Sequence, residues 1–255
     1  MNPSATETSP THLLKGHIQN LRKTRRNQDF FFTAAARAKR GATAITAGLA
    51  GLGGIATGLS GMALDTTEEA DLLEFEIYGQ AVRVWVCQSV FNEGDDVEVV
   101  AEKVGEVWQG YGIFGQSDKI VALHPHCSRG RWAHYKASLK LVSIAYLTLV
   151  SGMAVVVLVV GLFHERAEVL SMVPIFAVAE LLIAIVLGVV GFRISRKFMG
   201  FVRLAERVFE TFGWREVKNI DLPAITKKDK APNDPVALGV SLSRRLGKTG
   251  VMKKE

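Results

Sequence analysis

The chain has 255 residues, of which 48% are hydrophobic and 22% charged, and its mean hydropathy is +0.19. Charged content is ordinary, so the apolar excess must be concentrated in particular segments. The net charge of +6 favours negatively charged partners, either nucleic acid or anionic lipid. Two cysteines, Cys87 and Cys127, exclude a disulfide framework. The N-terminal residues lack the apolar core of a secretory signal peptide, which predicts synthesis in the cytoplasm without one.

The first 33 residues predict a disordered tail and then a pair of strands. Residues 1–11 are rich in Ser, Thr and Pro, and we expect them to be disordered. Residues 13–33 have apolar ends around a basic middle, which predicts either two strands or a β-hairpin. Its tip would carry Arg22, Lys23, Arg25 and Arg26. This tip could bind nucleic acid, but anionic lipid explains the charge more simply beside apolar spans, so we expect no nucleic-acid partner.

A stretch of small residues from Ile45 to Ala63 lies in a predicted helical insertion over residues 34–70. The four-residue spacing of Gly54 and Gly58 lets two helix backbones approach closely. The proposed packing glycines are Gly48, Gly51, Gly54, Gly58 and Gly61. The segment could be a third membrane span, or a helical excursion packed on the other spans. Two short helices joined by a turn are favoured, because a single crossing would put the strands on its two sides on opposite faces of the bilayer.

Alternating strands occupy most of the region between the insertion and residue 126. Two strands join near Gly79, and further turns fall at Glu93-Gly94, Gly105 and Ser117-Asp118. Short strands with turns every eight to twelve residues predict a small antiparallel barrel of the OB or SH3 type. The fold class expected is therefore an α+β membrane protein, in which residues 12–126 form a barrel domain that carries the helical insertion.

The sequence HPHC at residues 124–127 offers possible metal ligands, together with His134. The spacing is too cramped for the usual two-ligand zinc knuckle, which has two to four residues between ligands. We favour a tight turn fixed by Pro125, in which the histidines cap the turn or face lipid head groups. No metal and no cofactor are expected.

Residues 127–195 predict a transmembrane helical hairpin. The two spans cover residues 141–163 and 174–194, and each is long enough to cross about 30 Å of hydrocarbon. Basic residues gather on one side of the spans and are expected to contact anionic lipid: Arg129, Arg131, Lys136, Lys140, Arg193, Arg196 and Lys197. The positive-inside rule then places both termini in the cytoplasm and the connecting loop in the periplasm.

Glu180 is the most informative charge, because it lies about two turns inside the second span. A carboxylate at that depth is unfavourable and is by default a functional candidate. In an oligomer, a ring of such carboxylates would favour cations. The alternative is a protonated acid that is hydrogen-bonded across the hairpin to Ser151 or Thr148.

Residues 196–213 predict an amphipathic helix. Its apolar face holds Phe198, Phe201, Ala205, Val208, Phe209 and Phe212. Its polar face holds Arg203, Glu206, Arg207 and Glu210. The apolar face would lie either in the membrane interface or against the barrel. Residues 214–255 are rich in Pro, Lys and Gly, and we expect a loose basic tail.

Several segments in this order resemble a known family. They include "NLRKTRRNQDFFFT", the glycine-rich stretch, "FNEGDDVEVVAE" and "ALHPHCSRGRWAHYK", followed by the membrane hairpin. Over roughly residues 13–195 the chain is similar to small type VI secretion system effectors of Gram-negative bacteria. The resemblance implies delivery into a target cell without a signal peptide, action on its inner membrane, a cognate immunity protein, and a chaperone or spike adaptor.

The sequence therefore supports two functional hypotheses. The first is a non-enzymatic toxin that inserts into the inner membrane, oligomerises through small-residue helices and leaks ions. The second is a resident inner-membrane protein with a cytoplasmic OB-like adaptor domain, in an arrangement similar to that of NfeD proteins. An enzyme is disfavoured, because the sequence has no nucleophile elbow, phosphate loop or dinucleotide fingerprint.

Overall fold

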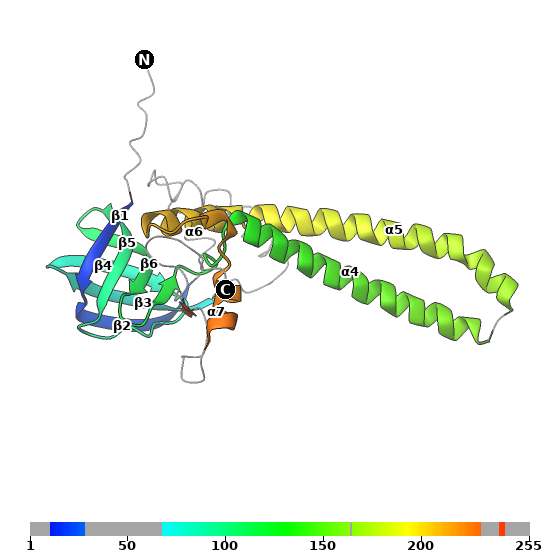
Figure 1. The fold of residues 1–255 in the computed structure, drawn as a ribbon, viewed down its shortest axis with the longest axis horizontal. Coiled ribbons are helices and arrows are strands. Elements are labelled where there is room, and N and C mark those ends of the chain that lie inside the picture. Colours follow the sequence, from blue (N-terminus) through cyan, green and yellow to red (C-terminus); the bar gives the residue numbers. More distant parts are fainter. Residues whose placement is uncertain (1–10, 29–67, 164, 231–239, 243–255) are drawn as a thin grey trace, which may run out of the picture. The chain divides into compact units, whose positions relative to one another are not determined.

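A computed structural model gives the fold and describes residues 11–28, 68–163, 165–230 and 240–242 (Figure 1). The chain forms two compact units, one of residues 134–196 and one of the residues on both sides of them. The strands are β1 (His12–His17), β2 (Gln19–Gln28), β3 (Glu68–Ile77), β4 (Gln80–Val86), β5 (Asp96–Val104), β6 (Val107–Gly115), β7 (Ile120–Leu123) and β8 (Val240–Leu242). The helices are α4 (Arg131–Gly161), α5 (Arg166–Lys197), α6 (Met199–Thr211), η2 (Val217–Asn219) and α7 (Leu222–Asp229).

The strands form one mixed sheet in the order β1-β5-β6-β4-β3-β2, to which β7 adds beside β6 and β8 beside β7. Neighbours are antiparallel except β4 and β6, which run parallel at Val82–Val84. In the described part of the chain the end strands β1 and β2 do not pair, so the sheet is open. The α+β class is confirmed, whereas the expectation of a closed antiparallel barrel is wrong in both closure and strand direction.

Over residues 13–28, the described part of this region, the alternative of two strands is confirmed, whereas the hairpin is wrong, because only Ile18 separates β1 from β2. One residue is too short for a turn that would let them pair. Ile18 is instead tied to another loop, where its N–H donates to Asp95 and its carbonyl accepts from Gly94. Consequently β1 pairs with β5 and β2 pairs with β3.

The basic residues predicted at a hairpin tip lie along β2 instead, opposite the acidic strand β3. Arg22 is the register partner of Glu74, and Arg25 is the partner of Asp71. The Nε of Arg25 also donates to Glu69 over 3.0 Å. Opposite charges on neighbouring strands stabilise their pairing, so part of this basic charge is used within the sheet.

The hairpin turns predicted at Gly79 and Gly105 are confirmed. Tyr78 and Gly79 both have positive φ, at 51° and 74°, as a two-residue turn between twisted strands requires. Gly105, with φ of 65°, lies between β5 and β6. Both glycines adopt a left-handed conformation that is costly for other residues.

One face of the sheet encloses a core that we call the sheet core. Alternation along β5 directs Val97, Val99 and Ala101 into it, while Val100 points to the opposite face. Its other buried members are Ile18, Leu73, Phe75, Ile77, Val82, Val84, Val86, Phe91, Ile113, Ile120 and Ala122.

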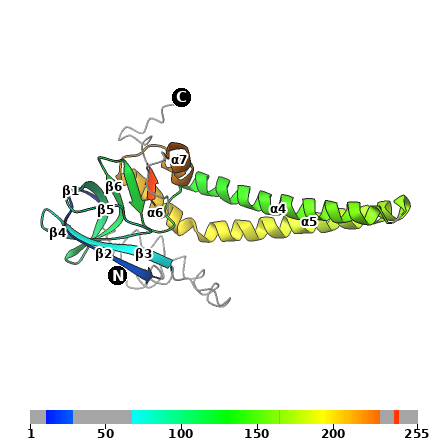
Figure 2. The ribbon, with the colours of Figure 1, turned by 90° about the horizontal axis from the view of Figure 1, so that it is seen from below.

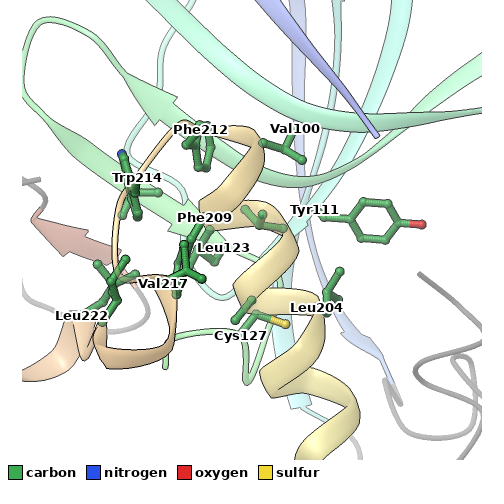
Figure 3. Close-up of a cluster of buried hydrophobic side chains, with 14 of the residues drawn as sticks. Val100, Tyr111, Leu123, Cys127, Leu204, Phe209, Phe212, Trp214, Val217 and Leu222 are labelled. Carbon is green, nitrogen blue, oxygen red and sulfur yellow. The ribbon is translucent and has the colours of Figure 1, made fainter. Parts of the chain in front are cut away.

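A second core, which we call the helix core, forms where α6 packs on the other face of the sheet. Figure 3 shows Phe209 of α6 beside Leu123 and Val217, while Leu204 projects from the other side of the helix. Gly112 of β6 permits this approach, because a Cβ there would lie 2.9 Å from the side chain of Val208. The apolar face predicted for this helix is confirmed, and it packs against the sheet rather than lying free.

The chain after α6 is more ordered than expected. Trp214, Val217, Ile220 and Leu222 are buried in the helix core, and β8 adds to the sheet beside β7. Asp221 caps α7 by accepting from the backbone N–H of Ala224. The expectation of a loose tail is therefore wrong for residues 214–229, because apolar side chains anchor this stretch.

The second unit is an antiparallel pair of long helices, α4 and α5 (Figures 1 and 2). The helix α5 begins at Arg166, eight residues before the predicted start of the second span, and contains Pro174. Residues 34–67 of the predicted helical insertion and residues 1–10 of the predicted tail lie outside the described residues, whereas residues 68–70, expected in the insertion, belong to β3.

Candidate functional site: the apolar helical hairpin and its basic end

By length and composition α4 and α5 are the two helices in the described residues that could cross a membrane. Their most apolar stretches are not buried within the protein. Large side chains such as Leu147, Leu158, Ile175 and Leu181 are more than half exposed. An exposed apolar surface of this extent marks a membrane or partner interface, so this hairpin is the candidate functional site.

The apolar side chains surround both helices and leave no polar stripe. An aqueous channel needs a polar lining, and the hairpin by itself does not supply such a lining. The few polar side chains in α4 bond to their own helix: Thr148 Oγ1 donates to the Ile144 carbonyl over 2.9 Å, and Ser151 Oγ donates to the Thr148 carbonyl over 3.0 Å. These bonds satisfy both hydroxyls at little cost in an apolar medium.

Glu180 of α5 is half-buried, and the structure links it to neither Thr148 nor Ser151. In the residues that the structure describes, this carboxylate forms no hydrogen bond or ion pair with another side chain. If α5 crosses a membrane, a carboxylate without a partner in its own hairpin needs a second copy, a partner protein or water beside it. The role predicted for Glu180 stays a prediction.

The two helices approach each other closely at one end of the hairpin. A Cβ on Gly191 of α5 would clash with Val142 of α4, so only glycine permits this approach. Near the same end, His134 Nε2 lies 3.2 Å from the backbone carbonyl oxygen of Ser195. A small residue at a helix crossing allows extensive van der Waals contact where lipid removes the hydrophobic driving force. Sequence reasoning missed this contact, although it used the same spacing argument for Gly54 and Gly58.

Five of the seven basic residues predicted to contact lipid are exposed at this end of the hairpin. None of the five pairs with a carboxylate in the described residues, although the guanidinium of Arg196 lies 5.8 Å from the ring centre of Phe192. The five are Lys136, Lys140, Arg193, Arg196 and Lys197. They remain available to anionic head groups.

The other two predicted lipid contacts have carboxylate partners in the first unit. Arg129 Nε donates to Asp221 over 3.1 Å. Arg131 forms a two-pronged pair with Glu206, with Nη2 to Oε2 at 2.8 Å, and its backbone N–H also donates to Glu206 Oε1 at 2.8 Å. Glu206 lies on the polar face of α6, as expected, but it is only 5% exposed because Arg131 covers it.

The HPHC segment forms a tight turn, in which the backbone N–H of Cys127 donates to the His124 carbonyl. His126 takes a left-handed conformation, with φ of 65°, and its ring centre lies 5.0 Å from that of Phe201. Among the described residues, no three His, Cys, Asp or Glu side chains converge as metal ligands. The histidines therefore pack against aromatic side chains.

A cavity of about 440 Å³ lies beside this turn. Cys87, from the end of β4, lines it together with Cys127, which sequence spacing could not indicate across forty residues. Burial, and then the negative charge of a Cys87 thiolate, raise the pKa of the Cys127 thiol well above its usual value. Cys127 is therefore an unreactive thiol at neutral pH.

Comparison with known proteins does not assign a family. No protein-family model matches the chain, and no curated protein or solved structure shows significant similarity to it.

Proposed function

We propose that α4 and α5 cross a bacterial inner membrane and anchor the sheet unit on its cytoplasmic side. The observation that carries this proposal is the exposed apolar surface of two helices that are each long enough to span the bilayer. Basic residues without a carboxylate partner among the described residues lie near the start of α4 and the end of α5, where the hairpin continues into the sheet unit. They support the orientation, because basic residues remain on the cytoplasmic side. The short connection at Glu165 would face the periplasm.

We further propose that the protein is a non-enzymatic type VI secretion effector that acts on the inner membrane of a target cell. The resemblance of "EGDDVEVV" and "PHCSRG" to that family motivates this assignment. Glu180 supports action within the bilayer, because an oligomer could surround such carboxylates with water and pass cations. A cognate immunity protein would protect the producing cell, and a chaperone or spike adaptor would cover the apolar helices before delivery.

A resident inner-membrane protein with a cytoplasmic adaptor unit is the second candidate. The absence of a polar stripe on the described hairpin favours it, because an anchor needs no aqueous lining. The sheet unit also has its own two cores, so it could present a rigid binding surface at the membrane.

Controlled expression in bacteria that lack an immunity partner separates these candidates. An effector should stop growth and collapse the membrane potential, as reported by a potential-sensitive dye. Glu180→Gln should weaken the depolarisation, while Ser151→Ala should not, because Ser151 bonds only to its own helix. Normal growth and an unchanged potential, with the protein found in the membrane, would reject the effector and retain the resident protein.

A further inference from the structure

A groove of about 360 Å³ lies between α4 and α5 at the basic end of the hairpin. Its lining includes Tyr135, Leu139 and Val142 from α4, and Gly188 and Phe192 from α5. The lining is almost entirely apolar, and the volume falls in the range of small-molecule sites, which is about 300–1,000 Å³. Within a bilayer such a groove does not stay empty, so its occupant is apolar.

Two glycines of α5 shape this groove in opposite ways. At Gly191 the helices approach so closely that a Cβ would clash with Val142. At Gly188, one turn deeper into the span, a Cβ would meet no atom within 4 Å. The helices are therefore held together at one level, while open space remains at the next level.

The groove is graded from a polar end to an apolar end. Ser138 and Ser195 line it near the start of α4 and the end of α5, whereas Val142 and Gly188 lie deeper in the spans. At about 1.5 Å per residue, Ser138 and Val142 differ in depth by about 6 Å. Ser195 is 4% exposed and its Oγ has no hydrogen-bond partner in the described part of the chain, which leaves a donor at the polar end.

Basic side chains lie at the same end of the hairpin as the polar end of the groove, although none of them lines it. Lys136 and Lys140 lie on α4 and Arg193 and Arg196 lie on α5, and all four are exposed and form no ion pair with described residues. Basic pockets between membrane helices at the cytoplasmic surface bind anionic head groups. The groove is apolar, and the cations near its polar end have no carboxylate partner in the described part of the chain. A molecule with an acyl chain and a phosphate would satisfy both features.

We propose that this groove binds one anionic phospholipid, of the phosphatidylglycerol type, from the cytoplasmic leaflet. An acyl chain lies against Val142 and Gly188, and the phosphodiester lies at the polar end, where Lys136 and Arg196 can reach it. The proposal rests on the proposed membrane insertion of the hairpin and adds a defined lipid to it. It does not depend on whether the protein is an effector or a resident protein.

The test is native mass spectrometry of the full chain released from nanodiscs that contain equal amounts of phosphatidylglycerol and phosphatidylcholine. We expect one retained phosphatidylglycerol per chain, with about a tenfold preference over phosphatidylcholine, because each basic residue near the surface favours anionic lipid. Gly188→Leu fills the groove and should abolish retention. Gly152→Leu is the matched control, because Gly152 has equally open surroundings but does not line the groove.

The head-group contact has its own variant, the double substitution Lys136→Gln with Arg196→Gln. It should remove the preference for phosphatidylglycerol while some phosphatidylcholine is still retained. Soluble glycerol 3-phosphate should not displace the lipid, because it has no acyl chain.

Three outcomes would overturn the proposal: undiminished retention by Gly188→Leu, equal retention of both lipids by the wild type, or a dimer that Gly188→Leu dissociates. Alkaline carbonate extraction of the wild type from membranes distinguishes a failure of the lipid-binding proposal from a failure of the membrane-insertion proposal. Extraction into the soluble fraction would overturn membrane insertion as well, whereas a chain that resists extraction and retains no lipid overturns the groove alone.

Discussion

Glu206 shows how a single carboxylate joins two elements of the first unit. It comes from α6, and it accepts from both the side chain and the backbone N–H of Arg131, the first residue of α4. The first backbone N–H groups of a helix have no partner within the helix, and a negative charge there is favourable. This contact fixes where α4 begins.

Replacing Glu206 with alanine should destabilise the first unit by about 1–3 kcal/mol, because a buried N–H and a guanidinium lose their acceptor. The measurement is thermal unfolding of the purified full chain in mild detergent, followed by tryptophan fluorescence. Glu210→Ala is the matched control on the same helix, since Glu210 is exposed. Equal losses of stability in the two variants would contradict the role assigned to Glu206.

The raised pKa of Cys127 predicts unequal reactivity of the two thiols. Iodoacetamide reacts with the thiolate, so at pH 8 the native chain should be modified at Cys87 first and at Cys127 only after unfolding. Peptide mass spectrometry after timed labelling measures both rates. Comparable rates for the two cysteines in the native protein would show that Cys127 is not protected.

The raised pKa of Cys127 also predicts how the free energy of unfolding changes with pH. Below about pH 8.5, the usual pKa of a free thiol, Cys127 is protonated in both the folded and the unfolded chain. In this range it therefore does not make the free energy of unfolding depend on pH. Above this range the unfolded chain loses the thiol proton while the folded chain keeps it, so stability falls as pH rises. The fall in the midpoint of thermal unfolding between pH 8.5 and 10 should be smaller in Cys127→Ala. An identical fall in both proteins would be evidence against this titration.

At the scale of elements, the contact between Gly191 and Val142 holds α4 and α5 together. Gly191→Ala should destabilise the hairpin by about 1–3 kcal/mol, the usual cost of overpacking. The double variant Val142→Ala with Gly191→Ala should recover most of this loss, because it removes the methyl groups that the new Cβ would meet. Thermal unfolding in detergent measures the stability of the wild type and of each variant. A double variant that is no more stable than Gly191→Ala would contradict this contact between α4 and α5.

Local patterns predicted the elements whose structure is set by neighbouring residues. Turn chemistry at Gly79 and Gly105 located two hairpins, and helical periodicity gave the buried face of α6. Pairing between distant segments was not readable in the same way, because β1 finds its partner in β5, some eighty residues later. The burial of Glu206 was not predicted for the same reason, since its partner Arg131 is 75 residues away.

At the scale of the whole molecule, we propose that the hairpin crosses the membrane with the sheet unit on the cytoplasmic side. Composition located both apolar stretches in the sequence, and the structure gives two helices that could span a bilayer. The proposed orientation follows from the distribution of charge, because basic residues remain on the cytoplasmic side.

The most direct test compares fusions of alkaline phosphatase and green fluorescent protein at Glu165 and at Glu255. Phosphatase is active only in the periplasm, and green fluorescent protein exported in unfolded form fluoresces only in the cytoplasm. The account predicts active phosphatase and no fluorescence at Glu165, with the opposite pair at Glu255. Fluorescence at both positions would show that the hairpin does not cross the membrane, and reversed signals would overturn the orientation.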